Sequence, residues 1–332
     1  MPELPEVETM ARDLAPLAEG AIIGGVWWDW ARTIRHPEPA VFERAISGRR
    51  VERVGRRAKW LVLDLSGGLV LVIQVKMTGQ VFVLPAGTVH DQHVHLRLTL
   101  DPGPVSGGRI HDGPRWLLFR DVRKFGRVGL YRRRADGVIL GADDEGELFG
   151  DHGPEPLEDD FTVRLFRERL RRRRGRLKTT LLDQSFVAGV GNIYADEALW
   201  RARLHPLRSA DGLNRDQERR LYQAIRAVMT EAIERRGSSI DDYTAPEGGG
   251  EMQTHLDAYQ RTGQPCHRCG RTIVRFELNA RGTHYCSWCQ RLPAADRTPA
   301  NLALVRRARR AARRGRSWSE LGGPTGAEER AH

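Results

Sequence analysis

The two matched cysteine pairs near the C-terminal end constrain the fold more than any other feature of the sequence. They are Cys266 and Cys269 and, after sixteen intervening residues, Cys286 and Cys289. Two CxxC knuckles around a β-like hairpin suit four thiolates on tetrahedral zinc with no open position; a redox pair is the alternative. Zinc can supply roughly 10–16 kcal/mol, enough to fold a module of about 25 residues with almost no core. We therefore predict one structural zinc, with His267 and His284 close enough to substitute as ligands.

The charge balance indicates a polyanionic partner. The 332 residues include 54 basic and 43 acidic side chains, for a net charge of +11. Nucleic acid is the first partner to consider for so basic a chain, although a basic protein without such a partner is the alternative. The sequence has no apolar run of about 18 residues and no signal-peptide pattern, so we expect no membrane span and a cytoplasmic, nucleoid-associated protein.

The first 134 residues predict a mostly antiparallel β sandwich with a packed N-terminal helix. Apolar residues recur at helical spacing from Val7 to Leu17, behind Pro5 in the first turn. The stretch "KWLVLDLSGGLVLVIQ" then reads as a hairpin about a Ser-Gly-Gly turn. The runs "QVFVLP", "HVHLRLTL", "RWLLFRDV" and "GRVGLYRR" continue the strand pattern.

The remainder divides into four further segments. Residues 135–158 are acidic and rich in Gly and Pro, which predicts a linker. Residues 159–262 are mainly helical, and 263–290 hold the cysteine module. Residues 291–332 contain ten arginines against four acids, so we expect a basic tail that is disordered or helical only on DNA.

Two short motifs suit nucleic acid, although each has an ordinary structural explanation. "GVGN", ending at Asn192, places glycines before a helix start, where free N–H groups can bind phosphate; most such turns only redirect the chain. "FRDVRKFGR" puts Arg123 and Phe125 two apart, on one face of an extended segment. They could fill a vacated base stack, or form one ordinary cross-strand pair.

The first residues, "MPELPEVETM", suit either a capped helix start or a nucleophile. Removal of Met1 would leave Pro2 with a free secondary amine. With a typical α-amino pKa of about 7.7–8.0, roughly a tenth of such amines are neutral at pH 7 and can attack a sugar C1′. Glu3 could supply a proton, and Glu6 lies one helical turn further on.

Taken in order, these motifs resemble the formamidopyrimidine-DNA glycosylase and endonuclease VIII family. The resemblance covers about residues 2–290 and is carried by "PELPEVE", "RRAKW", "KMTGQ", "FRDVRKFG", "GPEPL", "LLDQSFVAGVGNIYADEAL" and the cysteine module. "PELPEVE" is similar to the formamidopyrimidine branch. The resemblance implies an α+β multidomain fold: an N-terminal antiparallel β sandwich, a central helix–two-turn–helix domain with a lesion-capping loop around 238–255, and a C-terminal zinc-finger β hairpin.

The resemblance also implies an activity. We expect a bifunctional DNA glycosylase and AP lyase that excises oxidised purines, namely 8-oxoguanine and formamidopyrimidines, through a proline Schiff base followed by β,δ-elimination. Its partner would be double-stranded DNA containing an oxidised base or abasic site, bound by a monomer. An endonuclease VIII-like preference for oxidised pyrimidines or hydantoins, and a non-catalytic zinc-stabilised DNA-binding protein, are the alternatives.

Site residues follow from the matched motif positions. Pro2 corresponds to the nucleophile, Glu3 to the acid, Glu6 to a supporting carboxylate, and Lys59 to a contact of the lesion-side phosphate. The candidate DNA contacts are Met77, Arg123 and Phe125 in the gap left by an everted base, Asn192 and Arg281 on the bent phosphates, and His93 and Lys178 as further contacts.

One departure from the family's motifs lies beside Met77, one of the residues expected to fill the gap left by the everted base. Family members commonly have a stretch like "HLGMSG" where this chain reads "QVKMTG", so Gln74 replaces histidine and Lys76 replaces glycine beside Met77.

Overall fold

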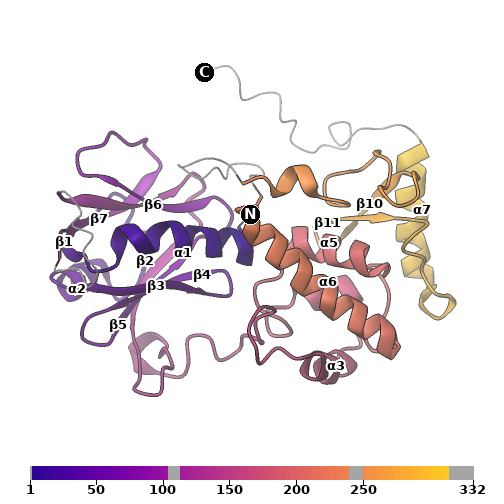
Figure 1. Cartoon of the computed structure of the whole chain (residues 1–332), viewed down its shortest axis with the longest axis horizontal. Helices are drawn as coiled ribbons and strands as arrows, with labels where there is room; N and C mark the ends of the chain where they lie inside the picture. The colour runs from indigo at the N-terminus through magenta and orange to yellow at the C-terminus, as the bar shows by residue number, and fades with distance from the viewer. Residues whose placement is uncertain (1, 104–112, 239–249, 314–332) are drawn as a thin grey trace. The chain divides into compact units, whose positions relative to one another are not determined.

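The computed structural model describes residues 2–103, 113–238 and 250–313 (Figure 1). The chain divides into two compact units. The first contains Met1–Asp151 and Ile233–Glu251, and the second contains His152–Ala232 and Met252–His332. Within the described ranges, no helix is long and apolar enough to cross a membrane.

The first unit is the predicted β sandwich with its N-terminal helix. Helix α1 spans Leu4–Ala18, close to the predicted limits. The strands are β1 (Ile22–Trp28), β2 (Ile34–His36), β3 (Val51–Arg57), β4 (Trp60–Leu65), β5 (Leu69–Gln74), β6 (Gly79–Pro85), β7 (Val94–Asp101), β8 (Arg115–Asp121) and β9 (Arg127–Arg132). Shorter helices are η1 (Ala31–Thr33), α2 (Pro39–Ile46) and η2 (Ala142–Asp144).

The strands form two sheets, in the orders β1-β7-β8-β6 and β2-β9-β5-β4-β3. The predicted hairpin is β4–β5, with Trp60 opposite Gln74 and Leu65 opposite Leu69. All named pairings are antiparallel except β2 with β9, which is parallel. The prediction of a mostly antiparallel sandwich is therefore confirmed.

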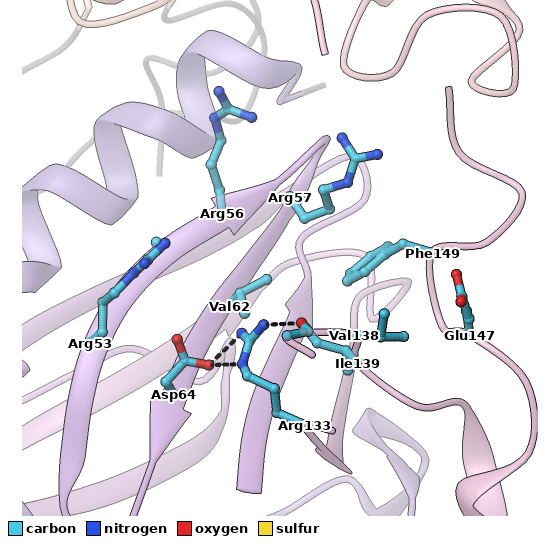
Figure 2. Close-up of a pocket in the computed structure, with 12 residues that line it drawn as sticks. Arg53, Arg56, Arg57, Val62, Asp64, Arg133, Val138, Ile139, Glu147 and Phe149 are labelled. Atoms are coloured by element: carbon cyan, nitrogen blue, oxygen red, sulfur yellow. Dashed lines mark hydrogen bonds and ion pairs between the residues drawn. The ribbon is translucent and has the colours of Figure 1, made fainter. Parts of the chain in front are cut away.

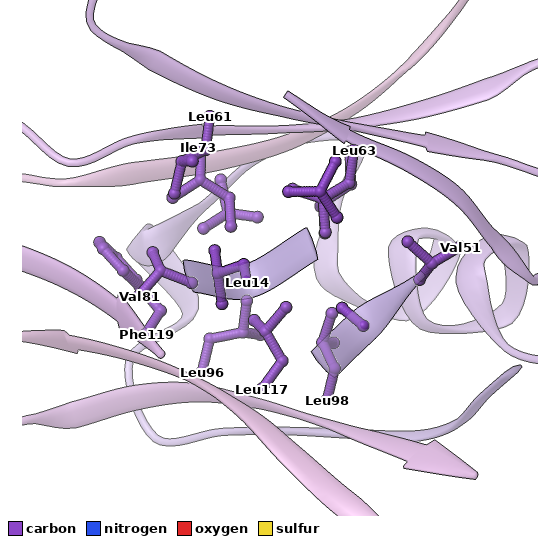
Figure 3. Close-up of a cluster of buried hydrophobic side chains, with 14 of the residues drawn as sticks. Leu14, Val51, Leu61, Leu63, Ile73, Val81, Leu96, Leu98, Leu117 and Phe119 are labelled. Carbon is purple, nitrogen blue, oxygen red and sulfur yellow. The ribbon is translucent and has the colours of Figure 1, made fainter. Parts of the chain in front are cut away.

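The core of this unit fixes helix α1. Leu14 lies between Leu61 and Ile73 of one sheet and Leu96 and Leu117 of the other, and all five side chains are at most 1% exposed (Figure 3). Burying each such side chain contributes about 1.5–3 kcal/mol. Because the apolar face of α1 is held on both sides, the start of the helix has a defined position.

The predicted linker 135–158 is partly a folded element of the first unit, contrary to expectation. Ile139 and Phe149 pack against Val62 and Val72 on the outer face of the five-stranded sheet. The acidic, Gly-rich composition obscured this packing, because the few apolar residues that cover the sheet are widely spaced.

The second unit contains the helices and the zinc-finger hairpin. Its elements are α3 (Val163–Arg171), α4 (Leu177–Leu182), α5 (Asn192–Ala202), η3 (Ala210–Gly212), most of α6 (Arg215–Glu234), η4 (Met252–His255), β10 (Ile273–Leu278), β11 (Arg281–Cys286), η5 (Ala294–Asp296) and α7 (Pro299–Arg313). Strands β10 and β11 form the predicted antiparallel hairpin.

The C-terminal segment corrects another expectation. Residues 299–313 form helix α7, which packs on β10, so the predicted disorder is wrong for this part. The helix forms without DNA because its apolar side chains are buried on the finger. Residues 314–332 lie outside the described residues.

Candidate functional site

Pro2 and Glu3 lead directly into helix α1, and both are buried. The Glu3 backbone N–H donates to Glu6 Oε2 at 2.8 Å, and the Glu3 side chain accepts the backbone N–H of Glu6. This reciprocal capping box satisfies N–H groups that a helix start otherwise leaves unpaired. Pro5 fits the first turn because the missing N–H is not needed there. The residues predicted to do the chemistry are therefore held by the helix they begin.

Glu6 also binds a segment 232 residues away in the sequence. Its Oε1 accepts the backbone N–H of Ser238 at 2.8 Å. Gly237 has φ +75°, and a Cβ there would lie 2.9 Å from that oxygen, so only glycine fits this approach. Ser238 bridges to Glu251. The predicted lesion-capping stretch falls mostly on 239–249, outside the described residues, but both of its flanks are anchored beside Glu6.

Lys59 lies at the tip of the β3–β4 hairpin in the same unit. Arg57 pairs with Trp60, so Ala58 and Lys59 form the two-residue connection. Ala58 has φ +53°, a left-handed conformation that costs a non-glycine residue about 1–2 kcal/mol. This tight turn leaves the Lys59 side chain partly exposed, as a predicted phosphate contact requires.

The predicted gap-filling residues are exposed at two neighbouring loops. Met77 is 36% exposed and Phe125 is 47% exposed. The Arg123 guanidinium carbon lies 5.3 Å from the centroid of the Phe125 ring. A cation and an aromatic ring are therefore presented together, but by a turn at 122–124 rather than by the extended segment that the sequence suggested.

Asp121 joins these two loops, and sequence reasoning missed it. Its carboxylate, 1% exposed, accepts the backbone N–H of Gly126 at 2.6 Å and of Arg123 at 3.3 Å. The Thr78 hydroxyl donates to the same carboxylate. The Asp121 N–H donates to the His93 carbonyl at 2.8 Å, which places His93, half-buried, beside the loop. The aspartate of "FRDV" followed by a turn was the available signal.

Two of the four lysines occupy left-handed positions in these loops. Lys76 and Lys124 both have φ +55°. Glycine would adopt such a position without a Cβ penalty, so lysine here bears a conformational cost. Burial, and then the charge of Arg127, lower the pKa of Lys76. The Lys124 ammonium lies 4.8 Å over the Trp30 ring.

In the second unit, Asn192 begins helix α5 directly after the glycine turn. Gly189 has φ +92°, and its N–H donates to Gln184 Oε1 at 3.0 Å. The Gln184 amide in turn donates to the Val190 carbonyl at 2.9 Å. Gln184 therefore fixes the turn that presents Asn192 at a helix N-terminus, where an anion is favoured.

Arg281 is exposed at the tip of the β10–β11 hairpin. Asn279 and Ala280 form its two-residue turn with φ of +50° and +56°, as the favoured type I′ turn requires. The Lys178 ammonium donates to the Gly282 carbonyl at 2.8 Å. The tip that presents Arg281 is thus docked on α4.

The prediction of a direct DNA contact at Lys178 is contradicted by its burial. The side chain is only 1% exposed, and its Nζ lies 2.7 Å from Asp196 Oδ1. Asp196 Oδ2 accepts the backbone N–H of His284 at 2.8 Å. Burying this charge requires a partner, and the pair ties α4 and α5 to the finger strand. Lys178 therefore positions the hairpin.

The four cysteines form the predicted metal site. Their sulfur atoms lie within 4.8 Å of one another, and tetrahedral zinc with Zn–S of 2.3 Å needs a separation of about 3.8 Å. Both histidines named as substitute ligands have other partners: His267 Nδ1 lies 2.8 Å from Asp257 Oδ1, and His284 Nδ1 lies 3.0 Å from Asp196 Oδ2. The cluster suits one structural zinc held by thiolates alone.

A cavity of about 330 Å³ on the outer face of the five-stranded sheet is separate from these residues (Figure 2). Val62, Ile139 and Phe149 line the cavity. Arg133 also lines it, and its Nε donates a hydrogen bond to Asp64 Oδ1 at 2.9 Å. None of its lining residues is a predicted site residue. The cavity therefore does not carry the predicted chemistry.

Comparisons with known proteins agree with this arrangement. Three family models match: the formamidopyrimidine-DNA glycosylase N-terminal domain over residues 1–128, its H2TH domain over 152–244, and the zinc finger found in FPG and IleRS over 263–292.

Individual relatives match over most of the chain. The formamidopyrimidine-DNA glycosylase of Roseiflexus sp. (strain RS-1) is 45% identical over 293 residues, covering 88% of this chain and all of the relative. That of Symbiobacterium thermophilum is 38% identical and covers 99% of this chain and all of the relative. A crystal structure of a Lactococcus lactis FPG mutant with Fapy-dG-containing DNA has a TM-score of 0.75 and 32% identity, covering 88% of this chain and all of that one. The chain belongs to the formamidopyrimidine-DNA glycosylase family.

Proposed function

We propose that this chain is a bifunctional DNA glycosylase and AP lyase of base-excision repair, acting on oxidised purines in duplex DNA at the nucleoid. The observation that carries the proposal is the bonding of Glu6 to both Glu3 and Ser238. A chain terminus normally frays, but here two backbone N–H groups on one buried carboxylate hold it. That arrangement suits a terminus whose amine must meet a substrate in a fixed geometry.

The chemistry needs only side chains and the terminal amine. After Met1 is removed, the Pro2 nitrogen attacks the sugar C1′, and the bond from C1′ to the damaged base breaks with its electron pair leaving on the base. Glu3 supplies a proton that assists base loss and opening of the sugar ring. The resulting iminium acidifies the C2′ proton. Its loss breaks the 3′ C–O bond, and a second elimination breaks the 5′ C–O bond.

Other residues give the DNA its required shape. Everting a base costs a few kcal/mol, and damage lowers this cost. The exposed side chains of Met77, Arg123 and Phe125 are suited to replace the stacking that is lost. Asn192 and Arg281 are suited to hold the bent phosphates, and zinc acts only by holding the hairpin that presents Arg281.

Borohydride trapping on a duplex with 8-oxoguanine opposite cytosine tests this proposal. We expect a covalent adduct with the wild-type chain and none with Pro2→Gly, and intact mass should show that Met1 is absent. Glu3→Gln should still be trapped on a pre-formed abasic site while losing base excision. No adduct with any oxidised base or abasic site would overturn the proposal. Comparing purine with pyrimidine lesions distinguishes the two branches of the family.

A further inference from the structure

Helix α7 lies beyond residue 292, where the last matched family model ends. Its inner side is apolar: Val305 and Ala308 are 8% and 1% exposed and form one hydrophobic cluster with Val274, Phe276 and Tyr285 of the hairpin. Figure 1 shows α7 alongside β10. Burial of this side explains why so arginine-rich a segment folds, since packing rather than propensity stabilises most helices.

A buried polar residue fixes the orientation of α7. Asn301, 6% exposed, accepts a hydrogen bond from Arg176 Nε at 3.0 Å and donates one to the Asp296 carbonyl at 2.8 Å. Its backbone N–H donates to the Thr298 hydroxyl at 3.2 Å, which caps the helix start. Residues on the outer face of α7 are therefore held in a defined direction relative to the finger.

Three arginines on that outer face form what we term the arginine ridge: Arg306, Arg307 and Arg310. Their spacing of three and four residues puts them on one side of the helix, opposite Val305 and Ala308. All three are exposed, and α7 contains no acidic residue. Among the described residues, none of the three has an ion-pair or hydrogen-bond partner.

Such a face is unfavourable for the isolated protein. Like charges at a spacing of four residues, as at Arg306 and Arg310, destabilise a helix by a few tenths of a kcal/mol. The dipole at the C-terminal end of α7 offsets this only in part. A rigid surface that holds three guanidinium groups without counter-charges is complementary to a closely spaced row of anions.

We propose that the arginine ridge binds the phosphate backbone of duplex DNA, as a contact additional to Asn192 and Arg281. The proposal rests on the proposed function, which makes duplex DNA the substrate. Guanidinium groups can bind phosphate oxygens through paired N–H donors without reading the base sequence. The ridge therefore adds sequence-independent affinity, and this affinity must depend steeply on salt.

The test is the salt dependence of binding to an undamaged duplex. Neutralising three phosphates contributes about 2.7 to the slope of log affinity against log salt concentration. The triple variant Arg306→Gln, Arg307→Gln and Arg310→Gln should flatten the slope by about two to three, and thermal unfolding should show that it is folded. The control carries Arg44→Gln, Arg164→Gln and Arg219→Gln, which remove the same charge from exposed sites elsewhere.

A ridge variant whose slope equals that of the wild-type chain would overturn the proposal, and would leave an acidic protein surface as the partner for the ridge. A control that flattens as much as the ridge variant would also overturn it, because net charge alone would then explain the effect. Borohydride trapping by the wild-type chain is measured separately. Its failure would overturn the proposed function, whereas a changed slope beside normal trapping concerns the ridge alone.

Discussion

Glu6 and Ser238 are joined by a hydrogen bond of 2.8 Å from the Ser238 backbone N–H to Glu6 Oε1. The other oxygen of the same carboxylate accepts the Glu3 N–H. One buried side chain thus links the proposed catalytic terminus to the flank of segment 239–249. Any change in this carboxylate should alter the position of both Glu3 and Ser238. Glu6 is therefore a positioning residue.

Glu6→Gln should therefore lower both stability and base excision. The amide has only one acceptor oxygen, so one buried backbone N–H is left facing an NH₂ group, at a cost of about 1–3 kcal/mol. We expect a lower unfolding midpoint in denaturant and slower excision of 8-oxoguanine, both measured on the purified variant. Glu8→Gln is the control, since its partly exposed carboxylate forms ion pairs with Arg12 and Arg56. Equal effects of the two substitutions would contradict the assignment.

The link between the loop that carries Met77 and the loop that carries Arg123 can be tested at Thr78. Thr78→Val removes the hydroxyl that donates to Asp121 and preserves the side-chain volume, whereas Thr78→Ser keeps the hydroxyl. Valine should weaken binding to a duplex containing a stable abasic-site analogue, because the loops carrying Met77 and Arg123 lose their connection. Serine should restore most of the binding. If valine binds as tightly as the wild-type chain, the hydrogen bond from Thr78 to Asp121 does not hold the loops in place.

The local features of this protein were predictable from its sequence, whereas its long-range pairs were not. Strand alternation and a Ser-Gly-Gly turn are local signals, and they gave the β4–β5 hairpin correctly. The bond between Thr78 and Asp121 joins residues 43 positions apart, and no short pattern encodes it. Burial of Lys178 depends on Asp196 in another helix, so a lysine in a DNA-binding motif looked like a contact. In α7, the apolar residues recur at helical spacing, but the high arginine content led to the prediction of disorder.

Lys76→Gly should separate backbone strain from DNA binding. Glycine adopts the φ of +55° without a Cβ penalty, and this relief should stabilise the folded state by about 1 kcal/mol. The greater freedom of glycine in the unfolded chain offsets part of this gain. We expect equal or higher thermal stability together with weaker DNA binding, since a cation beside Met77 is lost. Lys76→Ala is the control, because it removes the charge and keeps the strained position. Unchanged binding in both variants would exclude a DNA contact at Lys76.

Metal analysis should find one zinc per chain, held by the cysteines alone. Cys269→Ser should reduce the zinc content and weaken DNA binding, because the hairpin that presents Arg281 loses its support. His267→Ala should leave the zinc content at one, since this ring is paired with Asp257. Loss of zinc in the histidine variant would show that His267 is a ligand.

Acid should destabilise the second unit through His205. Burial, and then the charge of Arg309, lower the pKa of His205 to about 3, and its Nδ1 accepts the Leu207 N–H at 3.1 Å. An unfolded histidine has a pKa near 6.5. The stability due to this group is therefore fully present above about pH 6.5 and is lost as pH falls towards 3, because only the unfolded chain takes up the proton. The loss at pH 5 should be about 2 kcal/mol.

His205→Asn removes the titration and retains an acceptor near the position of Nδ1. Its unfolding free energy in denaturant should fall less between pH 7.5 and 5 than that of the wild-type chain, because the remaining acid-sensitive groups are common to both. The variant is expected to be less stable than wild type at pH 7.5, since the ring contact with Tyr285, at 4.6 Å between centroids, is lost. The difference between the two pH profiles therefore reports the buried imidazole. Parallel profiles would show that this ring is already accessible to protons in the folded chain.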